Sequence, residues 1–223
     1  MGTPVLIIGE SGEGKSTSIA TLPPEKTIVL NTENKDLPFE HSDKFTNKIM
    51  DSFKRLDATL DILMTEKGDK YEYVVLDSFT SATEIIERYS EFAFKGYDQW
   101  KNYNAMLREI IIKLKKLKQQ VFVIAIPEQK DIGFNQTKLY ARVKGKELKF
   151  GYIEKEFAIV LFTEPVFDDE TGEVEDVQFA YRPNRNNTAK APVGLFSEKP
   201  KNDCLFVANR IKEFYGRKEE ETS

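Results

Sequence analysis

The sequence has few of the residues that build disulfide frameworks and metal clusters. Its 223 residues include one cysteine, Cys204, and one histidine, His41. A single cysteine cannot form an internal disulfide, which fits a reducing compartment and predicts a cytoplasmic protein. The histidine lies in a polar stretch and is interpreted as a solvated loop residue. A histidine-rich metal site is therefore excluded.

Long apolar runs and an excess of positive charge are also absent. No run approaches the ~20 apolar residues that span a bilayer. The first residues lack the basic region and apolar stretch of a signal peptide, so we expect no membrane partner. The net charge of −4 gives no global reason for nucleic-acid binding. Any site for a polyanion would have to be a local basic patch.

Short β-branched apolar runs alternate with helical patterns along most of the chain. The runs predict strands at Val5–Ile8, Thr27–Leu30, Tyr73–Leu76, Val121–Ile126 and Phe157–Phe162. Helices are predicted at Lys15–Thr21, Ser52–Met64, Ser78–Phe94 and Gln99–Leu117. Alternating βα units predict an α/β fold with a doubly wound, mostly parallel sheet flanked by helices.

The last third of the chain changes character. A turn signal around Gly172 lies between β-rich runs at Ala158–Phe162 and Val177–Arg182, which predicts an antiparallel hairpin at the sheet edge. A closing helix is predicted at Phe206–Tyr215. The length suits one domain with a substantial core and is marginal for two. We expect a single domain at 1–216 and a disordered tail at 217–223.

The first predicted strand leads directly into a glycine-rich segment that fits the pattern G-x-x-x-x-G-K-[ST]. Backbone N–H groups of such a loop, and of the helix that follows, point at the phosphates of a nucleotide. Lys15 reaches the β- and γ-phosphates, and the hydroxyl of Ser16 ligates Mg²⁺. The predicted nucleotide-binding residues are Gly9, Glu10, Ser11, Gly12, Glu13, Gly14, Lys15, Ser16 and Thr17.

Two acidic residues follow other predicted strands. Asp77 ends the run Tyr73–Leu76, where a carboxylate can hold Mg²⁺ through its water shell. Capping of the next helix by Asp77 or Ser78 is a compatible alternative. No acidic residue directly follows Asp77, so the catalytic base is sought elsewhere. Glu33, just past the second strand, is the candidate, and an exposed loop glutamate is the alternative.

Motifs of other nucleotide-binding classes are absent. Guanine recognition needs N-K-x-D, but Asn34-Lys35-Asp36-Leu37 has the wrong spacing and follows the wrong strand. The D-x-x-G motif is not met after Asp77, and no arginine-rich lid typical of small-molecule kinases is seen. The predicted ligands are therefore ATP and Mg²⁺.

The phosphate loop at the start, the glutamate after strand two and the Asp-Ser pair after strand three together resemble a RecA-like P-loop ATPase core. Within it, the chain is similar to the short phage recombination ATPases that assist single-strand annealing. The resemblance covers nearly the whole chain. It implies a ring or filament of identical subunits, and a cytoplasmic location in a bacterial host.

The resemblance also implies two kinds of accessory residue. A polar sensor of the γ-phosphate is expected after the fourth strand, where Gln129 is the first candidate and Glu128 the second. A cationic finger that enters a neighbour's ATP site is expected from Lys190 or, as second choice, Arg185. For the finger, ordinary surface charge is the alternative.

The segment 128–150 is locally basic. Three anions oppose its six cations, and the aromatic residues Phe134, Tyr140 and Phe150 are interleaved. Phosphate pairing combined with base stacking holds single strands without sequence preference. A solvated basic loop or a β-hairpin with a charged face is the alternative. The predicted DNA-binding residues are Lys130, Lys138, Arg142, Lys144, Lys146 and Lys149.

The leading hypothesis is a Mg-dependent ATPase of phage-type homologous recombination and single-strand annealing. It would bind single-stranded DNA as an oligomer, with other phage recombination or replication proteins as further partners. One alternative is a replication accessory or loader ATPase. Another is a module that binds ATP without hydrolysis and serves annealing or partner binding.

Overall fold

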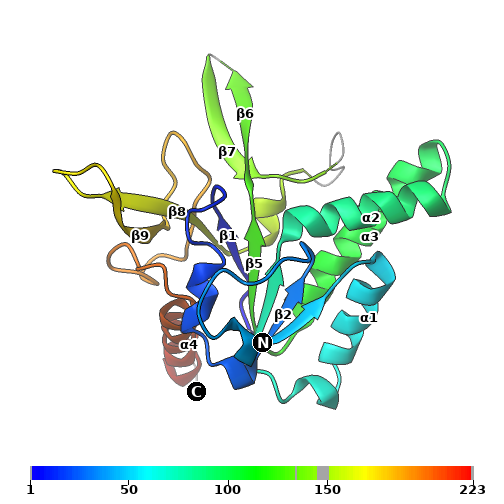
Figure 1. The fold of residues 1–223 in the computed structure, drawn as a ribbon, viewed down its shortest axis with the longest axis horizontal. Coiled ribbons are helices and arrows are strands. Elements are labelled where there is room, and N and C mark those ends of the chain that lie inside the picture. Colours follow the sequence, from blue (N-terminus) through cyan, green and yellow to red (C-terminus); the bar gives the residue numbers. More distant parts are fainter. Residues whose placement is uncertain (1, 134, 145–150, 222–223) are drawn as a thin grey trace.

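The computed structural model describes residues 2–133, 135–144 and 151–221, without the side chains of 217–221. Seven strands form one sheet in the order β3-β2-β4-β5-β1-β8-β9 (Figure 1). Neighbouring strands from β3 to β8 in this order pair in parallel, and β9 pairs antiparallel with β8. Their bounds are β1 Val5–Ile8, β2 Thr27–Asn31, β3 Thr46–Ile49, β4 Tyr73–Asp77, β5 Gln120–Ala125, β8 Ile159–Phe167 and β9 Val174–Ala180.

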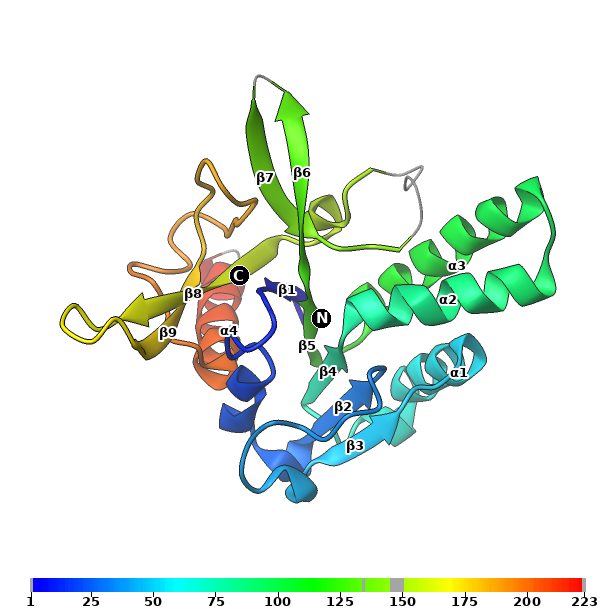
Figure 2. The same cartoon turned by 45° about the horizontal axis from the view of Figure 1, so that its top comes forward.

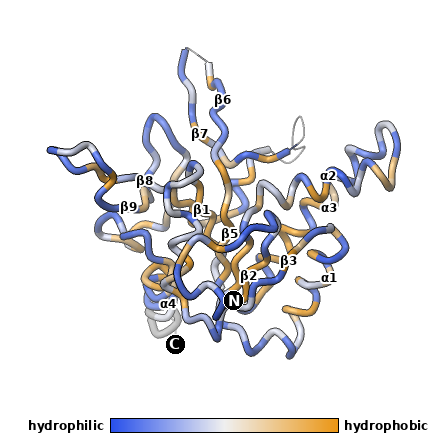
Figure 3. Tube along the Cα trace, viewed as in Figure 1, coloured by the Kyte–Doolittle hydropathy of each residue, from blue (hydrophilic) through white to orange (hydrophobic). Residues whose placement is uncertain are grey.

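Helices cover both faces of the sheet (Figure 2). On one face, α1 (Phe53–Leu63), α2 (Phe79–Ala93) and α3 (Tyr97–Lys116) pack on one set of alternating strand residues. On the other face, α4 (Cys204–Glu221) and the 3₁₀ helix Thr17–Thr21 pack on the other set. The central strands are mostly apolar, as Figure 3 shows, because both of their faces are covered. The predicted α/β fold is confirmed.

Two hairpins project from this body (Figure 1). One is the end of β8–β9, which confirms the predicted antiparallel hairpin after the parallel strands. The other is a separate two-stranded sheet of β6 (Pro127–Gly133) and β7 (Gln136–Ala141), which rises from the carboxyl end of β5. The segment 128–150 thus contains a hairpin rather than only an irregular loop.

Several boundaries differ from the sequence-based expectations. The segment after the phosphate loop, predicted as a helix over Lys15–Thr21, forms only the short 3₁₀ helix Thr17–Thr21. Strand β3 was not predicted, because it is polar and largely exposed. Helix α4 begins two residues before Phe206 and ends at Glu221, inside the segment expected to be a tail. The division into a domain and a tail stays a prediction, and residues 222–223 lie outside the described part.

The 3₁₀ helices that connect these elements are Pro24–Lys26, Ser42–Lys44, Glu66–Gly68 and Ile153–Glu156. In the part of the chain that the structure describes, no helix combines the length and apolar character needed to cross a membrane.

Candidate nucleotide site

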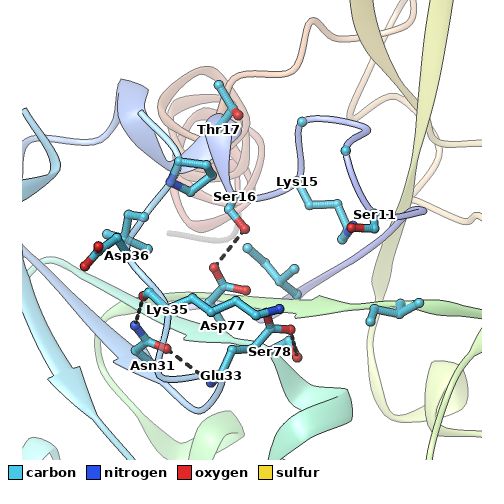
Figure 4. A pocket seen from close by; sticks show the side chains of 16 residues that line it. Ser11, Lys15, Ser16, Thr17, Asn31, Glu33, Lys35, Asp36, Asp77 and Ser78 are labelled. Carbon is cyan, nitrogen blue, oxygen red and sulfur yellow. Dashed lines mark hydrogen bonds and ion pairs between the residues drawn. The ribbon is translucent and has the colours of Figure 1, made fainter. Parts of the chain in front are cut away.

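The loops that follow β1, β2 and β4 meet at one end of the sheet. Parallel strands place their carboxyl ends along one edge, where ligands bind in open α/β folds. A pocket of about 360 Å³ opens there. It is lined by Ser11, Gly12, Gly14, Lys15, Ser16, Thr17, Asn31, Glu33, Lys35, Asp36, Leu37, Pro38, Asp77, Ser78, Ile124 and Ile126. The structure therefore brings the predicted phosphate loop, Asp77 and Glu33 to one cavity (Figure 4).

The phosphate loop depends on a glycine at Gly14. Its φ of 77° lies in the left-handed region, where side chains are strained. A Cβ there would also lie 2.7 Å from Nδ2 of Asn202, which donates a hydrogen bond to the Gly14 carbonyl at 2.8 Å. The segment that precedes α4 thus supports the loop from behind.

The Lys15 side chain lies in the pocket and is 8% exposed. Its Nζ donates to the carbonyl oxygen of Glu10 at 2.5 Å. Burial lowers the pKa of the Lys15 ammonium, and the charge of Glu13 is the largest effect that opposes this. A phosphate would supply the negative charge that this desolvated cation needs.

The side chains of Ser16 and Asp77 are in direct contact in the pocket. The Ser16 hydroxyl donates to Oδ2 of Asp77 at 2.9 Å (Figure 4). Burial raises the pKa of the Asp77 carboxyl, and the hydrogen bond from Ser16 opposes this effect. The peptide bond between Asp77 and Ser78 is cis.

These two oxygen groups fit Mg²⁺. The ion prefers oxygen ligands and takes only one or two from the protein when a nucleotide and water complete its shell. A partly buried carboxylate beside a hydroxyl supplies this donor set, and a cation would offset the desolvation of Asp77. Across residues 2–133, 135–144 and 151–221, no group of three or more His, Cys, Asp or Glu side chains is placed to hold a metal.

Glu33 enters the pocket on a short polar turn. Its backbone N–H donates to Oδ1 of Asn31 at 3.1 Å. Its Oε1 accepts from the Ser78 hydroxyl at 2.9 Å, and its Oε2 lies 3.2 Å from the Lys35 ammonium. The Ser78 hydroxyl also accepts from the N–H of Ser81, so Ser78 caps α2 while it orients Glu33.

The sequence reasoning missed the partners that orient Glu33. Besides Ser78 and Lys35, Thr32 joins the ends of β2 and β4. Its Oγ1 donates to the Ser78 carbonyl at 2.6 Å and accepts from the Ser78 N–H at 2.9 Å. The available signal was the run of polar residues after strand two, but chain spacing alone does not show which of them reach Ser78.

A second missed feature holds the phosphate loop at its start. Oε2 of Glu13 accepts hydrogen bonds from the Glu10 N–H at 2.7 Å and from the Thr163 hydroxyl at 2.8 Å. Thr163 lies on β8 and approaches so closely that a Cβ at Gly9 would be 1.8 Å from its Oγ1. These contacts tie a carboxylate within the loop to the sheet.

The accessory residues predicted from the resemblance lie outside this pocket. Gln129 is exposed on β6, and its Nε2 donates to the Thr137 hydroxyl at 2.6 Å. Lys190 forms a β-bridge with Val160, and Arg185 is exposed on the connection between β9 and α4. Neither the sensor nor the finger is brought to the nucleotide site of its own subunit, and both roles stay predictions.

Lys190 also has an electrostatic neighbour in the fold, Glu154. Burial raises the pKa of the Glu154 carboxyl, and the charges of Lys130 and Lys190 oppose this effect. Its Oε1 accepts from the Ala141 N–H at 2.5 Å, so this carboxylate anchors the base of the β6–β7 hairpin. Lys190 therefore contributes to the electrostatic environment of a buried acid in its own subunit.

The predicted DNA-binding cations divide between the hairpin and the segment after it. Lys130 and Lys138 lie directly opposite each other on β6 and β7. Arg142 and Lys144 are exposed beyond β7, and Lys144 is tied to the body by its N–H, which donates to Thr83 Oγ1 at 3.0 Å. The remaining residues of the prediction lie outside the described part of the chain: Phe134, Lys146, Lys149 and Phe150.

A profile described as an AAA domain matches residues 1–193. The chain belongs to this family. The match contains the phosphate loop, Glu33, Asp77 and both hairpins, so the whole candidate site lies within the AAA domain. The family supports ATPase-type activity in general, and the sheet is that of a RecA-like P-loop NTPase. A comparison with curated proteins gives no match.

Proposed function

We propose that this AAA domain hydrolyses ATP with Mg²⁺ and acts as an oligomer on single-stranded DNA in phage-type recombination and annealing. The observation that supports hydrolysis is the convergence of Lys15, Ser16, Asp77 and Glu33 on one pocket. A bound Mg²⁺ would help neutralise the negative charge that develops on the phosphates during transfer. Ser16 and Asp77 are the residues that would hold it.

In this proposal the chain's own groups divide the work of hydrolysis. Lys15 supplies positive charge to the β- and γ-phosphates in a site where water screens little. Glu33 accepts the proton of the attacking water. Ser78 donates a hydrogen bond to one carboxylate oxygen of Glu33, and Lys35 forms an ion pair with the other. These two contacts fix the orientation of the Glu33 carboxylate in the pocket.

The test of the base is Glu33→Gln, which keeps the shape and the hydrogen bond from Ser78. ATP binding should persist while turnover falls by about 100-fold or more, the usual contribution of a general base. Glu25→Gln, at an exposed glutamate outside the pocket, is the matched control and should keep full turnover. Unchanged turnover in Glu33→Gln would place the base elsewhere.

Support for single-stranded DNA comes from one face of the β6–β7 hairpin. The register places Lys130 opposite Lys138 and Glu128 opposite Tyr140, so these four side chains share a face. Like charges directly opposite each other destabilise a ladder. Glu128 pairs with Lys130 at 3.2 Å, which leaves Lys138 as the cation on this face that a phosphate would neutralise. Tyr140 also stacks on Tyr152, with ring centroids 4.1 Å apart, beside the two lysines. Cations and aromatic faces together suit a phosphate backbone with splayed bases.

The hairpin is linked to the nucleotide site through Thr80. This residue lies in the first turn of α2, just after Asp77 and Ser78. Its Oγ1 accepts from the Ile126 N–H at 3.1 Å and donates to the Arg142 carbonyl at 3.2 Å, at the two ends of the hairpin segment. We propose that the nucleotide state sets DNA affinity by this route.

DNA binding is tested by fluorescence anisotropy with a labelled single-stranded oligonucleotide, with and without a non-hydrolysable ATP analogue. Lys130→Ala with Lys138→Ala should weaken binding and reduce the salt slope by about 0.7 for each lost phosphate contact. Lys44→Ala, at an exposed lysine in the 3₁₀ helix Ser42–Lys44 outside the hairpin, is the control. An unaltered slope would remove the hairpin from the DNA site.

Turnover with and without single-stranded DNA separates the main proposal from a purely structural use of ATP. A rate stimulated by DNA supports the proposal, and no turnover in either condition supports the non-hydrolytic module. An unwinding assay on a forked duplex would detect the motor activity of a helicase-like or loader ATPase.

A further inference from the structure

The tip of the β8–β9 hairpin is acidic and carries exposed apolar side chains. Residues 167–176 contain six carboxylates and no lysine or arginine. Phe167 and Val174 lie directly opposite each other, so their side chains share a face, and they are 56% and 55% exposed. An exposed apolar pair surrounded by negatively charged residues is typical of an interaction surface rather than of a solvated turn.

The opposite end of the same sheet has the complementary properties. A groove of about 580 Å³ lies between β3 and α1. It is lined by Ile28, Asn47, Lys48, Ile49, Met50, Arg55, Thr59, Ile62, Leu63, Lys67, Lys70 and Tyr71, which include four cations and no carboxylate. Ile49 and Ile62 are 45% and 50% exposed.

The cations of this groove are largely uncompensated. Arg55 pairs with Asp51 at 3.0 Å. Within the described ranges, none of Lys48, Lys67 and Lys70 forms an ion pair with a carboxylate. In the part of the chain that the structure describes, strand β3 has one edge without a partner strand, because it is the last strand of the sheet on that side.

We propose that the acidic β8–β9 tip of one copy docks in the basic β3–α1 groove of the next copy. Apolar surface on the tip would meet apolar surface in the groove, and carboxylates would face lysines. The two surfaces lie at opposite ends of the sheet order, as Figures 1 and 2 show. A contact between two different surfaces repeats head to tail, which builds a ring where the rotation closes and a filament where it does not.

This interface rests on the oligomeric state in the proposed function and gives it named surfaces. Charge complementarity of this kind mainly sets orientation and association rate, and the buried apolar pairs supply much of the affinity. Salt screens exposed charges over about 8 Å at physiological strength. Assembly should therefore weaken as salt is raised.

The experiment is charge reversal followed by light scattering coupled to gel filtration, with Mg²⁺ and an ATP analogue present. The groove variant carries Lys48→Glu, Lys67→Glu and Lys70→Glu. The tip variant carries Glu170→Lys, Glu173→Lys and Glu175→Lys. Each alone should weaken self-association by about 100-fold or more, because like charges then face each other. Glu109→Lys on α3 is the control and should assemble like the wild type.

Restoration is the decisive readout. A chain with all six reversals should assemble again, and so should an equimolar mixture of the groove and tip variants, because opposite charges face each other in both cases. Recovery in the mixture also shows that neither variant is simply misfolded.

Failure has two distinguishable forms. Wild-type assembly that neither reversal weakens, or that the mixture fails to restore, overturns this interface and leaves the proposed ATPase and oligomer standing. A wild type that stays monomeric with nucleotide at all concentrations overturns both the interface and the proposed oligomer, while ATP turnover is measured separately.

Discussion

The contact between Glu13 and Thr163 leads to a sharp prediction about nucleotide affinity. Glu13 lies within the phosphate loop, where its negative charge would repel the phosphates. Two donors, the Glu10 N–H and the Thr163 hydroxyl, hold its carboxylate at the start of the loop. Thr163→Val removes one donor and keeps the branched shape. We expect ATP to bind more weakly, because the carboxylate is then free to turn toward the phosphates.

The magnitude follows from the interactions involved. A hydrogen bond to a charged group contributes about 1.5–3 kcal/mol, and the lower figure suits this partly exposed pair. A unit charge placed about 6 Å from a phosphate charge, at an effective dielectric constant of about 20, adds a repulsion of about 3 kcal/mol. Solvent will screen part of this repulsion. The expected result is a tenfold larger dissociation constant for ATP, which corresponds to about 1.4 kcal/mol.

The assay is titration of a fluorescent ATP analogue, with KM and kcat measured alongside. Thr163→Ser keeps the hydroxyl and is the matched control. Glu13→Gln keeps an acceptor for both donors and removes the charge, so it should bind ATP at least as tightly as the wild type. In the double variant Glu13→Gln/Thr163→Val the loss should largely disappear. The reasoning is refuted if Thr163→Val binds ATP normally, or if it loses as much affinity in the Glu13→Gln background as in the wild-type background.

Three further outcomes are expected. Asp77→Asn keeps an acceptor for Ser16 but removes a carboxylate that burial disfavours. The free energy of unfolding of the ligand-free protein should therefore rise by ~0.5–2 kcal/mol, while Mg-dependent turnover is lost. A lower melting temperature contradicts this. Thr80→Val should reduce the nucleotide-dependent change in DNA affinity about fivefold, ~1 kcal/mol of coupling, measured by anisotropy with and without nucleotide. The Cys204 sulfur lies 3.2 Å from the Ser18 hydroxyl, and burial raises the pKa of the Cys204 thiol to about 12. A thiol reagent at about pH 8 should therefore label Cys204 only after unfolding, and rapid labelling of the native protein would show that this contact opens.

The residues that line the pocket could be proposed from the sequence because each of them lies in a local pattern or at a strand end. Gly9–Ser16 is a local pattern, and Asp77 and Glu33 each follow an apolar strand. Parallel strands in one sheet bring such positions together whatever the details of packing. The expected pocket could therefore be assembled from strand ends alone, and the structure brings Lys15, Ser16, Glu33 and Asp77 together in it.

The contacts that orient these residues could not be predicted in the same way. Thr163 is 150 positions from Glu13, and its approach depends on the placement of β8 beside β1. Strand β3 was missed because an edge strand with polar, exposed residues lacks the apolar run that marks buried strands. Both features depend on tertiary neighbours rather than on local pattern.

Strand β8 connects the phosphate loop with the acidic tip of the β8–β9 hairpin. Thr163 contacts the phosphate loop, and Phe167 lies four residues further along the same strand, at the acidic tip. Four strand residues span about 13 Å. A tip held in the groove of a neighbour would fix the strand that supports Glu13. Because linkage is reciprocal, ATP should then strengthen assembly by the same factor by which assembly strengthens ATP binding.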